Sequence, residues 1–215
     1  MEKEAKFPVP DPLVWEQIAQ AVKVSGLDQI PRGREAQHNV YFDTPDGALA
    51  RAAYACRLRE VAGRRTLAVK GPAQAKREVL CRYEAEFPVG PESLPNGVPL
   101  ASIVLELLPA EVREKVSPLG PLAVILRSGT DRRIFGLEKA GRRVCELCLD
   151  EVNFEVEGRE VPVYRELELE LKDGTEAEQV RLVRWFREQW GLSTTGRSKL
   201  EVGLELTGRS WPPEP

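Results

Sequence analysis

Residues 166–171 read Glu166-Leu167-Glu168-Leu169-Glu170-Leu171, and Lys172 continues the same rhythm. Successive side chains of a β-strand point to opposite faces of the sheet. A strand here therefore places its charges on one face and its leucines on the other. The stretch predicts an antiparallel strand whose leucine face covers a core.

The same alternation recurs in other segments of the chain. Arg57 and Arg59 flank a leucine, and Arg82, Glu84 and Glu86 lie in phase with one another. Any one such strand is typical of a sheet with one solvated face. Two predicted helices, however, need an apolar surface to cover, and the leucine face of the sheet is that surface. The charged faces then lie on the other side, which becomes a lumen if the sheet curls into a barrel.

The N-terminal segment carries charges of both signs on one face. In a strand, Glu2, Glu4 and Lys6 share a side, and two neighbouring carboxylates repel each other unless a cation lies between them. A lumen lined by such charges is costly unless they are satisfied. Carboxylates prefer hard cations such as Mg²⁺ or Mn²⁺, and arginines and lysines bind phosphate oxygens. The residues alone therefore predict a metal and polyphosphate site inside a β-barrel.

Composition limits the class of protein. The chain has 215 residues, of which 42% are hydrophobic and 30% charged, with a net charge of −3. This length suffices for one large domain, and because we find no linker we expect a single domain over residues 1–215. The negative balance argues against a general nucleic-acid binder. Because no apolar run approaches the roughly 20 residues that span a bilayer, and no signal peptide is visible, we expect a cytoplasmic protein without a membrane partner.

Local signals predict both helices and strands. Asp11 suits a helix N-cap before Pro12, and we expect this helix to end at Gly26. Thr175 and Glu178 form a capping box for a helix over 176–190. Two short helices are expected at 100–108 and 111–116. Beyond the N-terminal segment, strands are expected at 38–43, 54–60, 66–70, 76–89, 121–127, 131–137, 143–157 (one strand, or two around a turn), 163–172 and 199–207.

The cysteines do not favour a zinc site. Cys145 and Cys148 form a CxxC pair, but a strand places them on opposite faces, and the chain has neither a second CxxC nor a histidine besides His38. Structural zinc needs four ligands. For these two, and for Cys56 and Cys81, we expect ordinary buried or half-buried thiols.

Taken in order, the motifs resemble those of the CYTH family, also called triphosphate tunnel metalloenzymes, which is related to class IV adenylate cyclases and thiamine triphosphatases. The matching stretches lie at residues 2–7 (EKEAKF), 41–45, 56–59 (CRLR), 67–72, 82–86 (RYEAE), 131–135, 149–151, 166–171 and 197–199. The resemblance implies an α+β fold, with a closed or nearly closed eight-stranded antiparallel β-barrel, the triphosphate tunnel, and helices packed on its outside.

The resemblance also implies roles for individual residues. Tyr41 and Lys70 would be catalytic and assist proton transfer. Two further sets of residues would bind the substrate and a metal cofactor, which would be Mg²⁺ or Mn²⁺. The substrate would be bound by Lys6, Arg57, Arg59, Lys70, Arg132, Lys199, Glu84 and Glu86, and the metal by Glu2, Glu4, Asp150, Glu166 and Glu168.

A few neighbouring positions stay open at this point. Glu170 points inward by its phase, without an assigned role. Arg127 and Arg133 are alternatives to Arg132, because the strand phase around Gly129 is hard to fix. The family's frequent pairing makes a homodimer one expected state.

The implied function is metal-dependent hydrolysis of the terminal phosphate of inorganic triphosphate or of a related triphosphate, a small molecule. The first alternative is a class IV adenylate cyclase, which would also need an adenine pocket. A second is thiamine triphosphatase, for which Trp15, Tyr54 and Trp190 are candidate stacking residues by type alone. A third is a non-catalytic polyphosphate-binding module, against which the full set of carboxylates argues.

Overall fold

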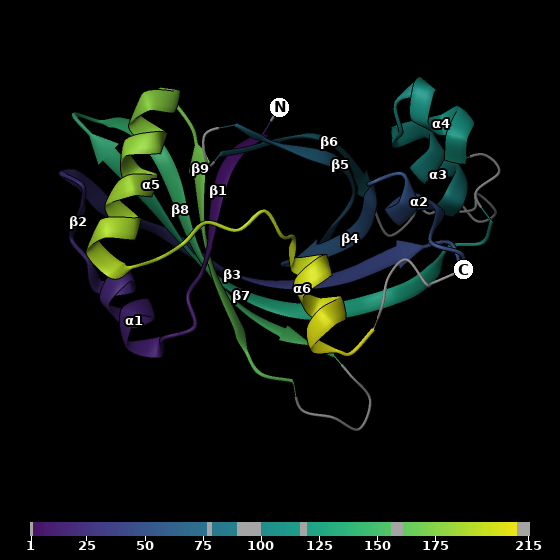
Figure 1. Ribbon diagram of the computed structural model, residues 1–215, viewed down its shortest axis with the longest axis horizontal. Coiled ribbons are helices and arrows are strands. Elements are labelled where there is room, and N and C mark those ends of the chain that lie inside the picture. Colours follow the sequence, from purple (N-terminus) through teal and green to yellow (C-terminus); the bar gives the residue numbers. More distant parts are fainter. Residues whose placement is uncertain (1, 77–78, 90–99, 117–119, 156–160, 210–215) are drawn as a thin grey trace.

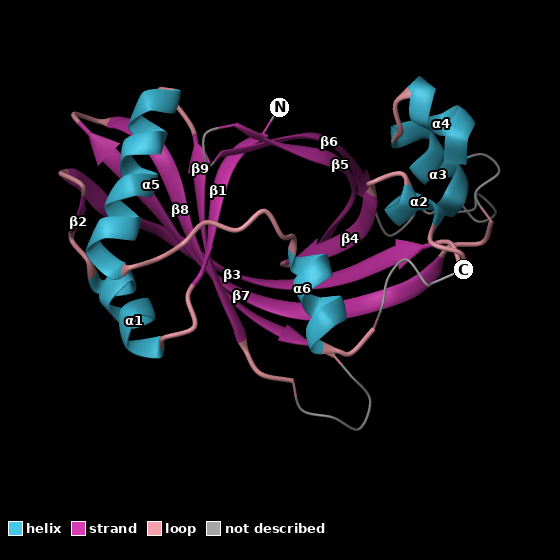
Figure 2. Cartoon of the chain, in the orientation of Figure 1, coloured by secondary structure: helices cyan, strands magenta, loops and turns pink. Residues whose placement is uncertain are grey.

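The computed structural model describes residues 2–76, 79–89, 100–116, 120–155 and 161–209. The side chains of residues 2, 73–82 and 115–116 lie outside this description. The chain forms nine strands and six helices within these ranges (Figures 1 and 2). The strands are β1 (Glu2–Pro8), β2 (Lys23–Val24), β3 (Leu27–Asp43), β4 (Ala55–Val61), β5 (Arg64–Lys76), β6 (Val79–Val89), β7 (Ala123–Lys139), β8 (Arg142–Phe154) and β9 (Tyr164–Leu171). The helices are α1 (Pro12–Gln20), α2 (Ala48–Arg51), α3 (Leu100–Leu107), α4 (Ala110–Val116), α5 (Glu176–Trp190) and α6 (Lys199–Leu206).

The sheet closes into a barrel. Its strand order is β2-β3-β4-β5-β6-β1-β9-β8-β7, every pairing is antiparallel, and β3 also pairs with β7. The β3–β7 pairing runs from Asp28 opposite Glu138 to Asp43 opposite Ala123. Eight strands therefore form a closed ring, and the two-residue β2 is an addition to β3. The predicted α+β barrel is confirmed.

The outward face of the barrel carries the larger hydrophobic core. Phe7 from β1 and Leu167 and Leu169 from β9 are fully buried against α1 and α5, which contribute Trp15 and Phe186. Both helices lie on the same side of the barrel in Figure 1. Because these odd-numbered residues point outward, their even-numbered neighbours must point into the barrel.

A second core lies beneath the short helices α2, α3 and α4. Leu49 of α2 and Val104 of α3 are buried together with Leu67 and Val69 of β5. This group covers the side of the barrel away from α1 and α5 (Figure 2). Helices therefore support the barrel from two sides. None of the described helices has the length and apolar character needed to cross a membrane.

The structure corrects several predicted strand and helix boundaries. The strand expected at 38–43 begins at Leu27, because β3 continues through Pro31 and Gly33 with a register shift between them. The strands expected at 121–127 and 131–137 are one strand, β7. Lys76 ends β5, so that β6 starts only at Val79. The first helix ends at Gln20 rather than Gly26.

The strand expected at residues 199–207 is wrong, because this segment is the helix α6. Ser198 accepts a hydrogen bond from the Glu201 backbone, and the Glu201 side chain accepts one from the Ser198 backbone. This capping box satisfies backbone groups that a strand would pair with a neighbour. The apolar residues at every second position suggested a strand, but the helix buries the consecutive residues Val202, Gly203 and Leu204.

The CxxC motif is consistent with buried thiols. Cys56, Cys145 and Cys148 are buried and free, and burial raises the pKa of each thiol to about 12. Cys145 packs in the core under α1 and α5. The side chain of Cys81 lies outside the described residues. Among the described residues, the grouping suited to a metal ion contains carboxylates and no cysteine.

Candidate functional site

The strand register brings the predicted site residues to the inner face of the barrel. Lys6 on β1 lies opposite Glu168 on β9. Asp150 on β8 lies opposite Glu166 on one side and Arg132 of β7 on the other. Directly opposed residues in antiparallel strands point to the same face. Charges far apart in the sequence therefore form one continuous inner surface.

A cavity of about 930 Å³ lies inside the barrel. Most of the predicted residues line it, and part of its wall is formed by Leu200 and Leu204 of α6 and by Ser198, the N-cap of this helix. Asp150 and Glu166 do not line it, because both are fully buried behind the cavity surface. The predicted residues that line the cavity are Glu4, Lys6, Tyr41, Arg57, Arg59, Lys70, Glu84, Glu86, Arg132, Glu168, Glu170 and Lys199.

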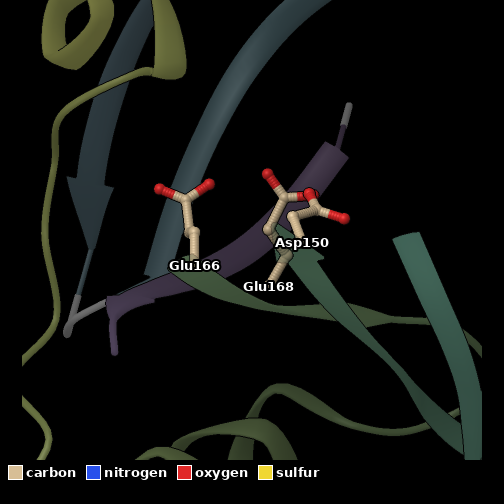
Figure 3. A group of neighbouring side chains, drawn as sticks. All are labelled: Asp150, Glu166 and Glu168. Carbon is tan, nitrogen blue, oxygen red and sulfur yellow. The ribbon is translucent and has the colours of Figure 1, made fainter. Parts of the chain in front are cut away.

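Lys199 lies at the centre of an acidic cluster. Its Nζ is 2.9 Å from Asp150 Oδ2, 2.5 Å from Glu166 Oε1 and 2.7 Å from Glu168 Oε1. Figure 3 shows the three carboxylates rising to the same side from β8 and β9. Lys199 is the first residue of α6, so this contact joins the helix to the barrel wall.

Arg132 completes the cluster from β7. Its guanidinium donates to both oxygens of Asp150, at 2.7 and 2.6 Å, and to Glu168 Oε2 at 2.5 Å. The two alternatives that the sequence left open face elsewhere. Arg127 is exposed, and Arg133 donates to Glu16 of α1 on the outer surface. Arg132 is therefore the arginine of this strand that faces the tunnel.

Burial and charge separate the pKa values of the clustered carboxylates. Burial raises the pKa of Glu166 above its ordinary value, against the attraction of Lys199 and Lys6. Burial acts in the same direction on Glu168, but Lys199, Lys6 and Arg132 together hold its pKa well below the ordinary range. Burial also disfavours the Asp150 carboxylate, yet Lys199 and Arg132 lower its pKa. At neutral pH, Glu168 and Asp150 are therefore anions held by cations.

Lys6 and Lys70 each have a carboxylate neighbour in the tunnel. Lys6 Nζ lies 3.4 Å from Glu4 Oε1 and 3.3 Å from Glu168 Oε1. Burial lowers the pKa of Lys6, but these carboxylates raise it above the ordinary value. Lys70 Nζ lies 2.8 Å from Glu84 Oε1 on the neighbouring strand. Both ammonium groups are therefore charged at the cavity wall.

Two arginines on β4 carry positive charge with little compensation. Arg57 is buried, and its Nε has no hydrogen-bond partner among the described residues. Arg59 donates to Asn39 Oδ1 at 3.1 Å, a neutral acceptor. Burial lowers the pKa of Arg59 to about 10, and repulsion from Arg57 and Arg132 contributes. Two neighbouring guanidiniums of this kind, close together in the cavity wall, form a site for an anion.

Tyr41 lies in the cavity wall next to these arginines. It is buried on β3 and lies directly opposite Arg57 of β4. Lys70 lies on β5, on the other side of β4. The structure therefore places Tyr41 and Lys70 in one cavity, separated by a strand.

The donor set fits a hard divalent cation. Asp150, Glu166 and Glu168 each offer a carboxylate oxygen, and these oxygens all lie within 4.8 Å of one another. Oxygen ligands of this kind suit Mg²⁺ or Mn²⁺. In this structure the Lys199 ammonium already lies among them. Glu4, which lines the cavity beside Lys6, offers a further carboxylate, whereas the Glu2 side chain lies outside the described residues.

Several contributors to the site carry no clear sequence signal. Ala53 lines the cavity with a positive φ of 61°, and Tyr54 follows it. Of the three aromatic candidates for stacking, Tyr54 reaches the cavity, whereas Trp15 and Trp190 pack with the outer core. The α6 wall could be found only through the Ser198 capping box. Arg165, which precedes the acidic residues of β9, donates to Glu151 at 2.9 Å and does not line the cavity.

Solved structures with this fold come from several organisms. The chain is 25% identical to HpAC1 of Hippeastrum, an adenylyl cyclase by designation with a dominant triphosphatase activity. The TM-score is 0.67, and the match covers 99% of this chain and 98% of that one. A candidate adenylate cyclase of Bacillus halodurans is 22% identical, with a TM-score of 0.60, over 94% and 98% of the two chains. A protein of Pyrococcus horikoshii is 19% identical, with a TM-score of 0.59, over 95% and 99%.

The sequence model of the CYTH domain matches residues 1–197, which include β1 to β9 and α5. The matched part ends just before α6 and Lys199. No curated protein sequence matches this chain. Because the family model covers most of the chain, including every strand of the barrel, and the barrel closes as the resemblance implied, the chain belongs to the CYTH domain family.

Proposed function

We propose that this protein is a divalent-metal-dependent triphosphatase that releases the terminal phosphate of inorganic triphosphate or of a related triphosphate. The observation that carries the proposal is the pair Arg57 and Arg59, which has no ion-pair partner among the described residues and lines a cavity that also holds carboxylates. Guanidinium groups bind phosphate oxygens through paired hydrogen bonds. A polyphosphate chain would supply the negative charge that these arginines lack.

The six basic residues come from five elements around the cavity, β1, β4, β5, β7 and α6, and would orient the phosphate chain from several sides. Preorganised cations stabilise the charge that develops when a phosphoryl group is transferred. Because the barrel fixes their positions, no reorganisation is needed during the reaction. The proposed substrate-binding residues are Lys6, Arg57, Arg59, Lys70, Arg132 and Lys199, with Glu84 and Glu86 beside them.

The proposed metal ligands are Glu2 and Glu4 on β1 and the cluster of Asp150, Glu166 and Glu168. A bound Mg²⁺ or Mn²⁺ supplies charge neutralisation at the phosphates and lowers the pKa of a coordinated water. Within the cluster, Lys199 and Arg132 already hold the carboxylates in place. In the ion-free protein these residues therefore keep the acidic group compact.

Tyr41 and Lys70 are the proposed proton-handling residues. Lys70 forms an ion pair with Glu84, and its ammonium would donate a proton to the oxygen of the leaving phosphate group. Tyr41 lines the cavity opposite Arg57, and its hydroxyl would hydrogen-bond the phosphate chain or the attacking water. Because β4 separates the two residues, we assign them to different ends of the phosphate chain.

A substrate panel tests the proposal. The protein is supplied with inorganic triphosphate, ATP or thiamine triphosphate, each with Mg²⁺ or Mn²⁺, and orthophosphate, diphosphate and cyclic AMP are measured. We expect orthophosphate from inorganic triphosphate and no turnover after the metal is removed with a chelator. Cyclic AMP and diphosphate from ATP, without orthophosphate from any substrate, would overturn the proposal in favour of a cyclase.

A variant on β1 tests the metal side of the same site. Glu4→Gln removes a carboxylate charge at the cavity wall, and we expect it to abolish metal-dependent turnover and weaken Mn²⁺ binding measured by electron paramagnetic resonance. Glu151→Gln is the matched control, because Glu151 pairs with Arg165 away from the cavity. Unchanged Mn²⁺ affinity and activity in Glu4→Gln would refute the N-terminal metal site.

A further inference from the structure

Tyr164, the first residue of β9, contacts Glu166 of the acidic cluster. Its hydroxyl donates a hydrogen bond of 2.8 Å to Glu166 Oε2. The other oxygen of Glu166 accepts from Lys199 Nζ at 2.5 Å. Glu166 is fully buried, so water does not reach it. The two oxygens of this carboxylate are therefore divided between a tyrosine of the barrel and a lysine of α6.

Several other contacts hold α6 against the barrel. Before the helix, the Thr195 amide donates to the Lys6 carbonyl at 2.9 Å, and after it Arg209 donates to the Ile125 carbonyl at 2.7 Å. The helix also buries Val202 in an apolar cluster that Tyr164 itself contacts. Tyr164 therefore touches both the packing of α6 and the carboxylate that binds its first residue.

We propose that Tyr164 is a positioning residue. Its hydroxyl holds Glu166 in the orientation that binds Lys199, and thereby keeps α6 packed against the barrel, where it lines the tunnel. Without the hydroxyl, Glu166 Oε2 is left buried without its partner, which is costly for a charged or polar group. The carboxylate then turns away from Lys199 or draws in water, and in either case the first turn of α6 loses part of its anchor. The effect on catalysis rests on the proposed function, but the effect on the helix does not.

Amide hydrogen exchange tests the helix directly, in the full chain without metal or substrate. We expect the amides of 202–206 to exchange about 10- to 100-fold faster in Tyr164→Phe, as follows from the loss of one buried hydrogen bond to a charged group. Amides of β1 and β8 should keep their rates. Tyr83→Phe is the matched control, since its hydroxyl donates to the Leu107 carbonyl at 2.7 Å away from α6.

Two outcomes would overturn the proposal. If the α6 amides exchange at the wild-type rate in Tyr164→Phe, the hydroxyl does not hold the helix. If amides of β1, β8 and α6 all accelerate by the same factor, the hydroxyl supports the whole barrel and not α6 in particular.

A kinetic measurement separates this proposal from the proposed function. We expect Tyr164→Phe to raise the KM for inorganic triphosphate several-fold with a smaller change in kcat, because Lys199 is displaced while the other cations stay in place. An unchanged KM would overturn the link to the tunnel wall. Should the wild-type protein show no triphosphate turnover, the proposed function fails, and the exchange rates of α6 still decide the role of Tyr164.

Discussion

Replacing Lys199 by methionine tests how the acidic cluster is held together. The substitution keeps an unbranched side chain only one atom shorter and removes the charge that lies within 3 Å of Asp150, Glu166 and Glu168. Two of these carboxylates are fully buried, and Arg132 and Lys6 remain to compensate the group. Removing one partner of a buried ion pair costs roughly 3–5 kcal/mol. We expect a loss of this size in the free energy of unfolding at pH 8.

The difference in unfolding free energy between the wild-type protein and the variant should depend on pH, and the pKa shifts give the direction of that dependence. Lys199 lowers the folded-state pKa of Asp150 and Glu168, so their contribution to stability is present above their ordinary values and is lost as the pH falls through the lower folded values. The pKa of Lys199 is raised well above 10.5, so the wild-type ammonium stays charged from pH 5.5 to 8. Without it, the carboxylates take up protons at mildly acidic pH. The difference between the two proteins should therefore shrink from pH 8 to pH 5.5.

Urea unfolding of both proteins at pH 8 and pH 5.5 measures this difference. A loss of 3–5 kcal/mol corresponds to a fall in Tm of roughly 6–20 °C for a chain of this size. Lys23→Met is the control, because Lys23 pairs with Asp28 at an exposed position and such pairs contribute about 0–1 kcal/mol. A loss below about 1 kcal/mol at pH 8, or an equal loss at both pH values, would refute the reasoning.

Two further predictions concern the anion site and the packing of α6 against the barrel. Arg57→Gln should lower kcat/KM for inorganic triphosphate by about 10- to 100-fold, since a charged hydrogen-bond donor at a phosphate contributes roughly 1.5–3 kcal/mol, while the urea midpoint stays within error. A wild-type kcat/KM would contradict the proposed anion site. Gly203→Leu should destabilise the protein by about 1–3 kcal/mol, because a Cβ at this position would lie 2.5 Å from Phe154 and 2.6 Å from Leu126. Gly129→Ala has open space and should be nearly neutral, and equal unfolding midpoints for the two glycine variants would argue against close packing of α6 on the barrel.

Local sequence patterns correctly predicted those strands and helices whose own residues show an alternation or a helix cap. The alternation at residues 166–171 predicted both the strand and its inward carboxylates, and β9 confirms it. The capping box of Thr175 and Glu178 predicted a helix over 176–190, and α5 has these bounds. Such signals are local, since side-chain period and capping depend on neighbours a few positions away.

Predictions failed where the decisive contact is distant in sequence. The segment 199–207 alternates apolar residues as a strand would, but its packing against Leu126 and Phe154 and its capping box make it a helix. The long β3 was missed because charged residues, a proline and a glycine precede residue 38. Its pairing partner, β7, lies about 100 residues further along the chain.

The sequence by itself determined which residues carry charge, which strands alternate and, through its motifs, which family the chain resembles. Only the tertiary structure decided that β3 and β7 close the barrel, that Arg132 rather than Arg127 or Arg133 faces the tunnel, and that Lys199 enters the acidic cluster from a helix. The physical reason is that a side-chain period assigns two faces to a strand without saying which face is enclosed. Enclosure depends on pairing between distant strands, and it is the burial that follows which brings six cations and their carboxylates into one cavity.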